Sequence, residues 1–228
     1  MQNTGNSALL RTLAASIADL SASGVRLVAI DGVDGAGKTT LADKLAEFVI
    51  ALGRPVVRAS VDGFHNPRSM RYRLGRSSPE GFYSDSYNYE LLRACLLTPL
   101  SRGRSRIYRR AAFDHTVDQP VHINEETAPP NAVLILDGIF LHRPELIGYW
   151  DFSVFLDVPF DISIPRGASR GADFGSSDPH APSNKRYIKG QKLYLRECRP
   201  QDRATVLIDN ADYQNPLIVA QRPSLMKD

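Results

Sequence analysis

A glycine-rich segment near the N-terminus has the residue types and the spacing of a phosphate-binding loop. The segment GVDGAGKTT (32–40) follows the apolar run VRLVAI, precedes an amphipathic stretch and matches the pattern G-x-x-x-x-G-K-[ST] in full. Glycines let the backbone turn its N–H groups inward, where they form a cradle for phosphate oxygens at the start of a helix. We therefore expect ATP to bind through Gly32, Asp34, Gly35, Ala36, Gly37, Lys38, Thr39 and Thr40.

We expect two side chains of the loop, and an acidic residue elsewhere in the chain that helps to bind Mg²⁺, to neutralise the negative charge of the triphosphate. Lys38 places an ammonium group against the terminal phosphates, and Thr39 offers a hydroxyl to Mg²⁺, which prefers oxygen ligands. A second metal ligand is expected from an acid that ends another buried strand. Asp137, directly after AVLIL, is our first choice, although a turn or a helix cap also explains an aspartate there. Asp31 is the alternative, since it also ends an apolar run.

An acidic residue after the second apolar run could activate an acceptor hydroxyl. Asp62 lies in RASVDGFH, and parallel strands present their carboxyl ends to one crevice. Transfer of a phosphoryl group to a hydroxyl depends mainly on alignment and charge neutralisation, and a carboxylate can take the hydroxyl proton. A turn formed by Asp-Gly is the alternative explanation.

Arginines near residue 170 form a third candidate group. Arg166 and Arg170 are four residues apart and would share a helical face if RGASR is helical, and the segment 171–184 is rich in Gly, Ser, Asp and Pro. A lid over residues 166–186 could bring these guanidinium groups, and Arg186 with them, onto the β- and γ-phosphates. A solvated surface is the alternative.

Short apolar runs separated by helical patterns predict the fold that positions these residues. The runs are nearly continuous in Val, Ile and Leu, which is typical of parallel strands covered on both faces. They occupy residues 25–30, 55–60, 132–136, 153–158 and 205–208. Helical spacing follows the glycine loop and precedes the last run, so we expect one α/β domain over residues 1–228 with a mainly parallel sheet. It begins with an amphipathic helix within residues 1–24, and its polar, aromatic segment 61–88 is long enough to be functional.

The overall composition limits the classes of function. The 228 residues carry a formal charge of +3, which suits an anionic small substrate and is too small for a nucleic-acid-binding track. Cys95 and Cys198 have no metal-type spacing and, like the absence of a membrane-length apolar run, favour a cytoplasmic location. His122, His142 and His180 receive no role. The arginine cluster SRGRSRIYRR predicts a solvated hairpin or the rim of a pocket, and homo-oligomerisation is left open.

Three segments together resemble one superfamily of kinases. GVDGAGKTT, DGFHNP with the later GRSSPEGFYSDSYNYELL, and LILDGIFLHRPEL are similar to the uridine kinase, pantothenate kinase and phosphoribulokinase superfamily of P-loop kinases, and most of all to bacterial uridine kinase-like proteins. The resemblance spans most of residues 25–212. It implies a three-layer α/β/α fold with a five-stranded parallel sheet, Mg·ATP as phosphate donor, Asp62 as general base, and lid arginines at Arg166 and Arg170.

The same resemblance implies where the acceptor and the adenine bind. Expected acceptor contacts come from Asp62, Phe64, His65, Tyr83, Tyr87, Tyr108 and His115, although core packing also explains the tyrosines. Asn210, after the last strand, lies where such kinases bind adenine, although a plain turn explains it equally well.

Departures from the pattern bear on the acceptor. Uridine–cytidine kinases have Asp-Ser-Phe-Tyr where this chain has Asp62-Gly63-Phe64-His65, which is nearer to pantothenate kinases, and YRRAAFDHTVD (108–118) keeps a Tyr, Phe, Asp and His at altered spacing. A nucleoside acceptor such as uridine leads, followed by pantothenate, a sugar, or a nucleotide as in thymidylate kinases, whose phosphate loop is similar. A regulatory P-loop NTPase is the alternative of a different class, but the chain lacks the guanine-selective Asn-Lys-x-Asp.

Overall fold

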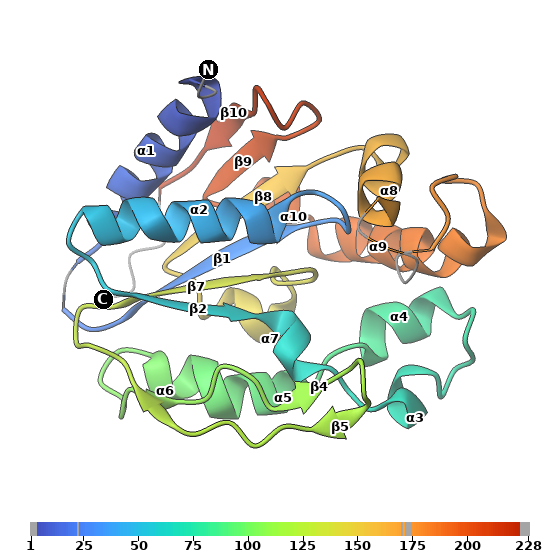
Figure 1. Cartoon of the computed structure of the whole chain (residues 1–228), viewed down its shortest axis with the longest axis horizontal. Coiled ribbons are helices and arrows are strands. Elements are labelled where there is room, and N and C mark those ends of the chain that lie inside the picture. The colour runs from blue at the N-terminus through green and yellow to red at the C-terminus, as the bar shows by residue number, and fades with distance from the viewer. Residues whose placement is uncertain (1–3, 22, 170, 172–174, 224–228) are drawn as a thin grey trace.

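A six-stranded sheet forms the centre of the computed structural model, which describes residues 4–21, 23–169, 171 and 175–223 (Figure 1). The strands are β1 (Arg26–Gly32), β2 (Val56–Ser60), β7 (Val133–Gly138), β8 (Phe152–Asp157), β9 (Val206–Asp209) and β10 (Leu217–Gln221). Their order is β10-β9-β8-β1-β7-β2, and every neighbouring pair is parallel except β9 and β10. The five predicted strands are confirmed, as is the α/β class.

The antiparallel edge strand β10 was not predicted. Its apolar residues Leu217 and Val219 are more than half exposed, so β10 is not a core strand with a buried apolar run. It pairs with β9 through backbone hydrogen bonds that are irregular between Ile218 and Ala220. A hairpin after the last core strand supplies this pairing, and local hydropathy does not encode it.

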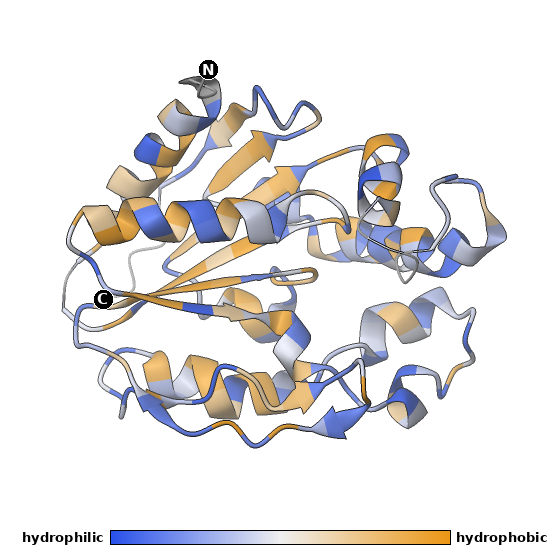
Figure 2. Ribbon diagram, viewed as in Figure 1, coloured by the Kyte–Doolittle hydropathy of each residue, from blue (hydrophilic) through white to orange (hydrophobic). Residues whose placement is uncertain are grey.

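Helices cover both faces of the sheet because alternate strand residues point to opposite sides. On one face lie α1 (Thr4–Ala18) and α2 (Lys38–Ala51), which pack on Val28 and Ile30 of β1. The predicted apolar face of the N-terminal helix is confirmed, since Leu10, Leu13 and Ile17 are at most 3% exposed. Figure 2 shows the hydrophobic residues concentrated in the strands, with mixed colouring along these helices.

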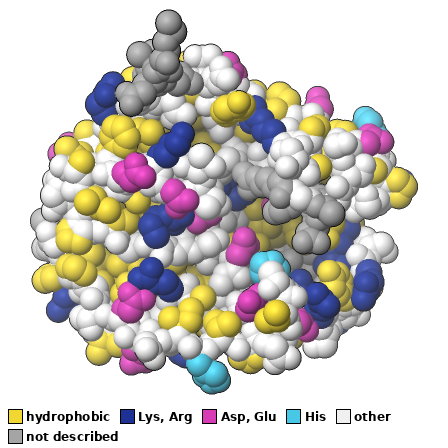
Figure 3. All heavy atoms as spheres, in the orientation of Figure 1, with side chains coloured by type: hydrophobic (Ala, Val, Ile, Leu, Met, Phe, Trp, Pro, Cys, Tyr) yellow, Lys and Arg dark blue, Asp and Glu magenta, His cyan; other side chains and the backbone are white. Residues whose placement is uncertain are grey.

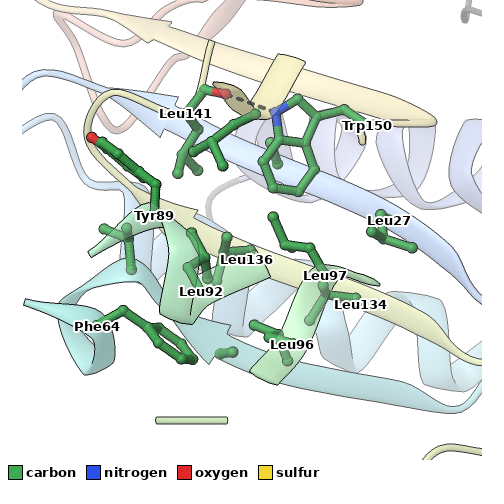
Figure 4. Packing of buried hydrophobic residues seen from close by; sticks show 14 of the residues in the cluster. Leu27, Phe64, Tyr89, Leu92, Leu96, Leu97, Leu134, Leu136, Leu141 and Trp150 are labelled. Carbon is green, nitrogen blue, oxygen red and sulfur yellow. Dashed lines mark hydrogen bonds between the residues drawn. The ribbon is translucent and has the colours of Figure 1, made fainter. Parts of the chain in front are cut away.

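The opposite face is covered by one helical stretch with a π-helical middle. It consists of α5 (Tyr89–Leu92), the π-helix Arg93–Leu97 and α6 (Thr98–Leu100). Pro99 has no N–H to donate to the carbonyl of Cys95 four residues earlier, and the Arg109 N–H donates to that carbonyl instead at 2.9 Å. Leu92, Leu96 and Leu97 of this stretch pack with Leu134 and Leu136 of β7, as Figure 4 shows.

The 61–88 insert is folded rather than an open loop. It contains a 3₁₀ turn (Val61–Phe64), α3 (Arg68–Arg71) and α4 (Pro79–Asp85). The Ser78 Oγ accepts the Gly81 N–H at 3.0 Å and Pro79 occupies the first turn, which defines the start of α4.

Short antiparallel ribbons lie against the insert. They pair β3 (Ile107–Tyr108) with β6 (Glu126–Thr127), and β4 (Phe113–Asp114) with β5 (Gln119–Pro120). The Ala112 N–H donates to the Gly63 carbonyl at 2.8 Å, and a Cβ at Gly63 would lie only 2.7 Å from that of Ala111. The glycine after Asp62 therefore lets the ribbon pack directly on the 3₁₀ turn.

The remaining helices follow β7 and β8. They are α7 (Pro144–Ile147), α8 (Phe160–Ala168), a 3₁₀ turn (Pro182–Asn184), α9 (Lys185–Cys198) and α10 (Pro200–Arg203). In Figure 1, α8 and α9 lie at the same end of the sheet as α4. No helix in the described ranges has both the length and the apolar character that a membrane crossing requires.

A buried polar network ties β1 to three other elements. Asp31 is fully buried; its Oδ1 accepts the Gly32 N–H at 2.7 Å, and its Oδ2 lies 2.7 Å from His142 Nδ1 and accepts the Tyr194 hydroxyl. The backbone N–H groups of Leu141 and His142 donate to the same Oδ2, and His142 Nε2 lies 3.0 Å from Ser153 Oγ. Because these bonds occupy both oxygens away from solvent, the alternative prediction that Asp31 binds the metal is wrong.

We predict that Asp31→Asn lowers the free energy of unfolding by about 3 kcal/mol or more, as expected when one partner of a buried charged network is removed. The amide would place an N–H₂ group against donors that now meet a carboxylate. Denaturant unfolding followed by circular dichroism measures the change. Asp19→Asn, on an exposed side chain, is the matched control. Equal stability of the two variants would contradict the structural role of Asp31.

Candidate functional site

The phosphate loop connects β1 to α2 and is built around two left-handed glycines. Gly35 and Gly37 have φ of 74° and 94°, and Gly37 is the N-cap of α2. A Cβ at Gly35 would lie 2.0 Å from the carbonyl oxygen of Ser163 in α8, so no other residue fits there. The loop therefore has the geometry that turns backbone N–H groups toward an anion at a helix N-terminus.

Contacts from side chains fix the loop on both sides. The Lys38 ammonium donates to the Val33 carbonyl at 2.8 Å, so the side chain arches back over the loop. The Asp34 N–H donates to the Gln191 Oε1 at 2.6 Å, and Gln191 is buried in α9. The sequence analysis did not identify Gln191 as a loop contact. Its spacing from Tyr194 on one helical face indicates only that its side chain points to the core, and not that it contacts the phosphate loop.

The predicted metal ligands lie together. The Thr39 hydroxyl donates to Asp137 Oδ2 at 2.7 Å, which joins the first turn of α2 to the end of β7. Asp137 is 2% exposed, and both donor atoms are hard oxygens of the kind that bind Mg²⁺. Among the described residues, no group of three or more His, Cys, Asp or Glu side chains could hold a metal. An ion bound here would thus take other ligands from the phosphates or water.

An arginine that sequence reasoning missed orients Asp137. The Arg58 guanidinium donates to Asp137 Oδ1 at 3.0 Å and to Asp43 Oδ1 at 2.8 Å, and it also contacts the Ile135 carbonyl at 2.6 Å. With Oδ1 engaged by Arg58, Oδ2 faces Thr39. The sequence signal that could have revealed Arg58 is that it is the only charged residue in the apolar run PVVRAS.

Asp62 lies at the same edge of the sheet, in the 3₁₀ turn that follows β2. It is exposed and comes two residues after Ser60, which pairs with Asp137 in the sheet register. Its Oδ1 accepts the Tyr87 hydroxyl at 3.0 Å. Burial, and then the negative charges of Asp62 and Asp34, raise the pKa of Tyr87 far above its ordinary value, so that hydroxyl remains a donor.

Two histidines complete the group around Asp62. The ring of His65 lies 4.5 Å from the ring of Tyr87 and 4.4 Å from that of His115, and its Nδ1 is 2.9 Å from the Asp62 carbonyl. Burial lowers the pKa of His65, with Asp62 opposing the shift and His115 and Arg71 adding to it. The face in Figure 3 shows histidine and acidic side chains gathered beside a hollow.

Three predicted acceptor contacts lie elsewhere. Phe64 is fully buried in the core on β7, so the prediction that it contacts the acceptor is wrong (Figure 4). Tyr83 packs on Phe140, with its hydroxyl 3.3 Å from Cys198 Sγ, and Tyr108 is 4% exposed and donates to Glu126 at 3.2 Å. These aromatic rings are used in packing, which the resemblance alone did not reveal.

A pocket of about 180 Å³ lies beside the phosphate loop. It is lined by Asn6, Leu9, Gly35, Ala36, Gly37, Thr40, Leu41, Lys44, Leu156, Arg166, Asn210, Tyr213 and Pro216. The Asn210 side chain donates to the Ala36 carbonyl at 2.7 Å, which places this predicted adenine contact next to the loop. Apolar side chains, a tyrosine and a guanidinium are a suitable lining for a purine ring. The contribution of α1 to this wall was not predicted.

The predicted lid arginines have separate positions. Arg166 lines the pocket, donates to the carbonyls of Asn210 and Ala211 and lies 5.4 Å from the Tyr213 ring centroid, so its role on the phosphates stays a prediction. Arg170 lies outside the described residues. Arg186 is 5% exposed and donates to the carbonyls of Arg71, Gly75 and Arg76. Arg186 thus fastens α9 to the 61–88 insert, and a role of Arg186 on the phosphates stays a prediction.

Comparison with solved structures identifies several kinases of the same architecture. A possible uridine kinase from Bacillus stearothermophilus is 25% identical, with a TM-score of 0.69 over 87% of this chain and 96% of that one. A candidate fructose transport system kinase from Silicibacter sp. TM1040 is also 25% identical, with a TM-score of 0.65 over 83% of this chain and 94% of that one. Phosphoribulokinase from Rhodobacter spheroides, 14% identical over 83% of this chain and 71% of its own length, shares the fold with a TM-score of 0.55.

The search of curated proteins found no match. The sequence model of the phosphoribulokinase / uridine kinase family matches residues 27–174, which is more than half of the chain and includes the phosphate loop, Asp62 and Asp137. The chain therefore belongs to the phosphoribulokinase / uridine kinase family of P-loop kinases.

Proposed function

We propose that this kinase transfers the γ-phosphoryl group of ATP to a hydroxyl of a small molecule, with Asp62 as the general base. The observation that carries the proposal is the position of Asp62: it is exposed, holds a hydrogen bond from Tyr87 and follows the strand whose Ser60 pairs with Asp137. Phosphate loop and acceptor carboxylate thus share one edge of the sheet, as in-line transfer between two bound molecules requires.

The nucleotide side of the proposal assigns a role to each loop element. The backbone from Gly32 to Thr40 and the Lys38 ammonium would hold the phosphates, and the pocket with Asn210 would hold the base. Thr39 and Asp137 fit Mg²⁺, because their oxygens are adjacent and Arg58 orients the carboxylate. Bound there, Mg²⁺ would neutralise charge that accumulates on the phosphates during transfer.

Among acceptors, a nucleoside remains our first choice. The rings of His65, Tyr87 and His115 lie together beside Asp62 and offer flat surfaces for a base, and one similar structure is described as a possible uridine kinase. A sugar is the second candidate, favoured by the polar character of this cluster and by the kinase from Silicibacter. The described acceptor cluster favours transfer to an alcohol over a slow regulatory hydrolysis. Cytoplasmic location stays a prediction, and the oligomeric state stays open.

A turnover assay with Mg·ATP against nucleosides, sugars and pantothenate tests the proposal. We expect at least one alcohol to accelerate ADP release well above the rate with water alone. Lys38→Ala should abolish turnover, because the terminal phosphates lose their ammonium partner. If the wild-type protein released ADP at the same rate with every acceptor as with none, the regulatory alternative would replace the kinase.

We predict that Asp62→Asn lowers kcat by about 100-fold or more, as loss of a positioned base does. The KM for ATP should stay within a small factor, since Asp62 is not part of the nucleotide pocket. Steady-state kinetics with the best acceptor measures both constants. Glu80→Gln, an exposed acid of the same insert, is the control. Unchanged kcat in Asp62→Asn would remove this residue from the mechanism.

We predict that Tyr213→Ala raises the KM for ATP about 10-fold with little change in kcat, because stacking of a base on an aromatic ring contributes about 1–3 kcal/mol. Tyr213 is 59% exposed, so its truncation should not unfold the protein. Inhibition by tripolyphosphate, which has no base, should be the same in the variant and the wild type. Val219→Ala, another exposed apolar residue, serves as control. Equal KM values for ATP would show that the base binds elsewhere.

A further inference from the structure

A hollow with a volume of about 330 Å³ lies at the edge of the sheet where β8 and β9 begin. Ser153 in its wall is the second residue of β8, Thr205 directly precedes β9, and Arg222 follows β10, whose end pairs with the start of β9. The phosphate loop instead follows the carboxyl end of β1, which is parallel to β8. We call this hollow the amino-edge pocket, and it lies at the opposite end of the strands from the proposed reaction. Its lining residues are Ile147, Trp150, Ser153, Arg203, Thr205, Arg222 and Pro223.

The amino-edge pocket has two cations and no acid in its wall. Arg203 is exposed and Arg222 is half-buried, and neither forms an ion pair with a described residue. The backbone N–H of Arg222 donates to the Thr205 carbonyl at 2.8 Å, and its Nη1 donates to the Ala204 carbonyl at 3.0 Å. These bonds fix one guanidinium group on the segment before β9. The apolar part of the wall consists of Ile147, Trp150 and Pro223.

Two buried hydroxyl groups line the same pocket. Ser153 and Thr205 are 4% and 9% exposed. Thr205 Oγ1 accepts the Ser153 N–H at 3.1 Å, and Ser153 Oγ accepts the Thr205 N–H at 3.2 Å. The hydroxyl hydrogen of Thr205 is donated to no described residue. Because a buried donor without an acceptor is costly, a ligand that offers an acceptor here would gain from it.

The Ser153 hydroxyl begins a buried chain of hydrogen bonds that ends at the phosphate loop. Ser153 Oγ lies 3.0 Å from His142 Nε2, and His142 Nδ1 lies 2.7 Å from Asp31 Oδ2. Since a carboxylate can only accept, Nδ1 carries a proton, and Nε2 of the neutral ring accepts the Ser153 hydroxyl. Asp31 Oδ1 accepts the Gly32 N–H at 2.7 Å. One side chain, His142, thus separates the wall of the pocket from the carboxylate that fixes the start of the loop.

We propose that the amino-edge pocket binds a small apolar carboxylate that regulates nucleotide binding at the phosphate loop. Guanidinium and hydroxyl groups donate to carboxylate oxygens, and the apolar wall covers the body of the ligand. A carboxylate carries a single charge, so it loses less hydration in a partly apolar pocket than a dianion does.

The hydrogen-bond chain gives the direction of the regulation. The oxygens of a bound carboxylate compete with His142 Nε2 for the Ser153 hydroxyl, because both are acceptors. His142 then loses one of the two partners that orient its ring, and Asp31 is held less firmly. The bound carboxylate therefore weakens the binding of ATP, a consequence that rests on the proposed nucleotide site.

The single tryptophan of the chain reports on the pocket directly. Trp150 lines it, and its Nε1 donates to the Leu141 carbonyl at 2.7 Å, as the dashed line in Figure 4 shows. Tryptophan fluorescence is titrated with phenylacetate, and with phenylacetamide as the uncharged probe of the same shape, in the absence of nucleotide. We expect phenylacetate to change the emission and to bind about 10-fold or more tightly than phenylacetamide, because only the carboxylate pairs with the two arginines.

Paired variants test the role of the charge. Arg203→Gln/Arg222→Gln should bind phenylacetate about 10-fold or more weakly than the wild type and phenylacetamide about equally well. Arg11→Gln/Arg196→Gln removes two exposed cations outside the pocket and should bind both probes like the wild type. Equal affinity of the wild type for the two probes would overturn the carboxylate site. Equal binding of phenylacetate by the wild type and the Arg203→Gln/Arg222→Gln variant would overturn it as well.

Calorimetry with a non-hydrolysable ATP analogue and Mg²⁺ measures the coupling to the phosphate loop. Saturating phenylacetate should raise the Kd of the analogue about 5-fold or more, and by linkage the analogue should raise the Kd of phenylacetate by the same factor. Ser153→Ala keeps both arginines but lacks the hydroxyl, so it should still prefer phenylacetate and lose most of this shift. An unchanged Kd of the analogue in the wild type, or an equal shift in Ser153→Ala, would overturn the coupling. Failure to bind the analogue at all would refute the proposed nucleotide site and the coupling with it, whereas the fluorescence titration decides carboxylate binding without any nucleotide.

Discussion

The site depends on the hydrogen bonds that Asp31 and Gln191 make to the backbone of the phosphate loop. A loop that turns its N–H groups toward an anion cannot also satisfy them internally, so its conformation must be fixed by its surroundings. Asp31 fixes the start of the loop through the Gly32 N–H, and Gln191 fixes the Asp34 N–H. Tyr194, three residues after Gln191 on α9, binds the same Asp31. One helix therefore holds the loop at two points.

The same helix connects the phosphate loop to the 61–88 insert. Gly190, adjacent to Gln191, lies against α4 so closely that a Cβ would be 2.8 Å from the Phe82 ring and the Pro79 carbonyl. Arg186 binds carbonyls of the 61–88 insert one turn earlier. The position of the insert that carries Asp62 relative to the phosphate loop is thus set by the packing of α9 as well as by the sheet.

Most of the fold and the phosphate loop could be predicted from the sequence because both depend on local patterns. Continuous apolar runs identified the five parallel strands, and the spacing of Gly32, Gly37, Lys38 and Thr39 identified the loop. The proximity of Thr39 and Asp137 could also be predicted, because the carboxyl ends of parallel strands meet at one edge of the sheet.

Residues whose surroundings are formed by distant segments could not be predicted in the same way. Phe64, Tyr83 and Tyr108 have the same residue types whether they line a pocket or a core, and only tertiary packing decides between the two. Arg58 and Gln191 act through partners 79 and 157 residues away in the chain, so no spacing indicates them. The apolar residues of the edge strand β10 are exposed, whereas hydropathy would predict that they are buried.

The contact between Gly35 and α8 has a consequence for movement. Since not even a methyl group fits between the phosphate loop and the Ser163 carbonyl, the two backbones touch without any side chain as a cushion. A displacement of α8 toward the sheet must push the loop by the same amount, because packed backbones are hardly compressible. Any movement of α8 against the sheet is for this reason mechanically coupled to the conformation of the phosphate loop.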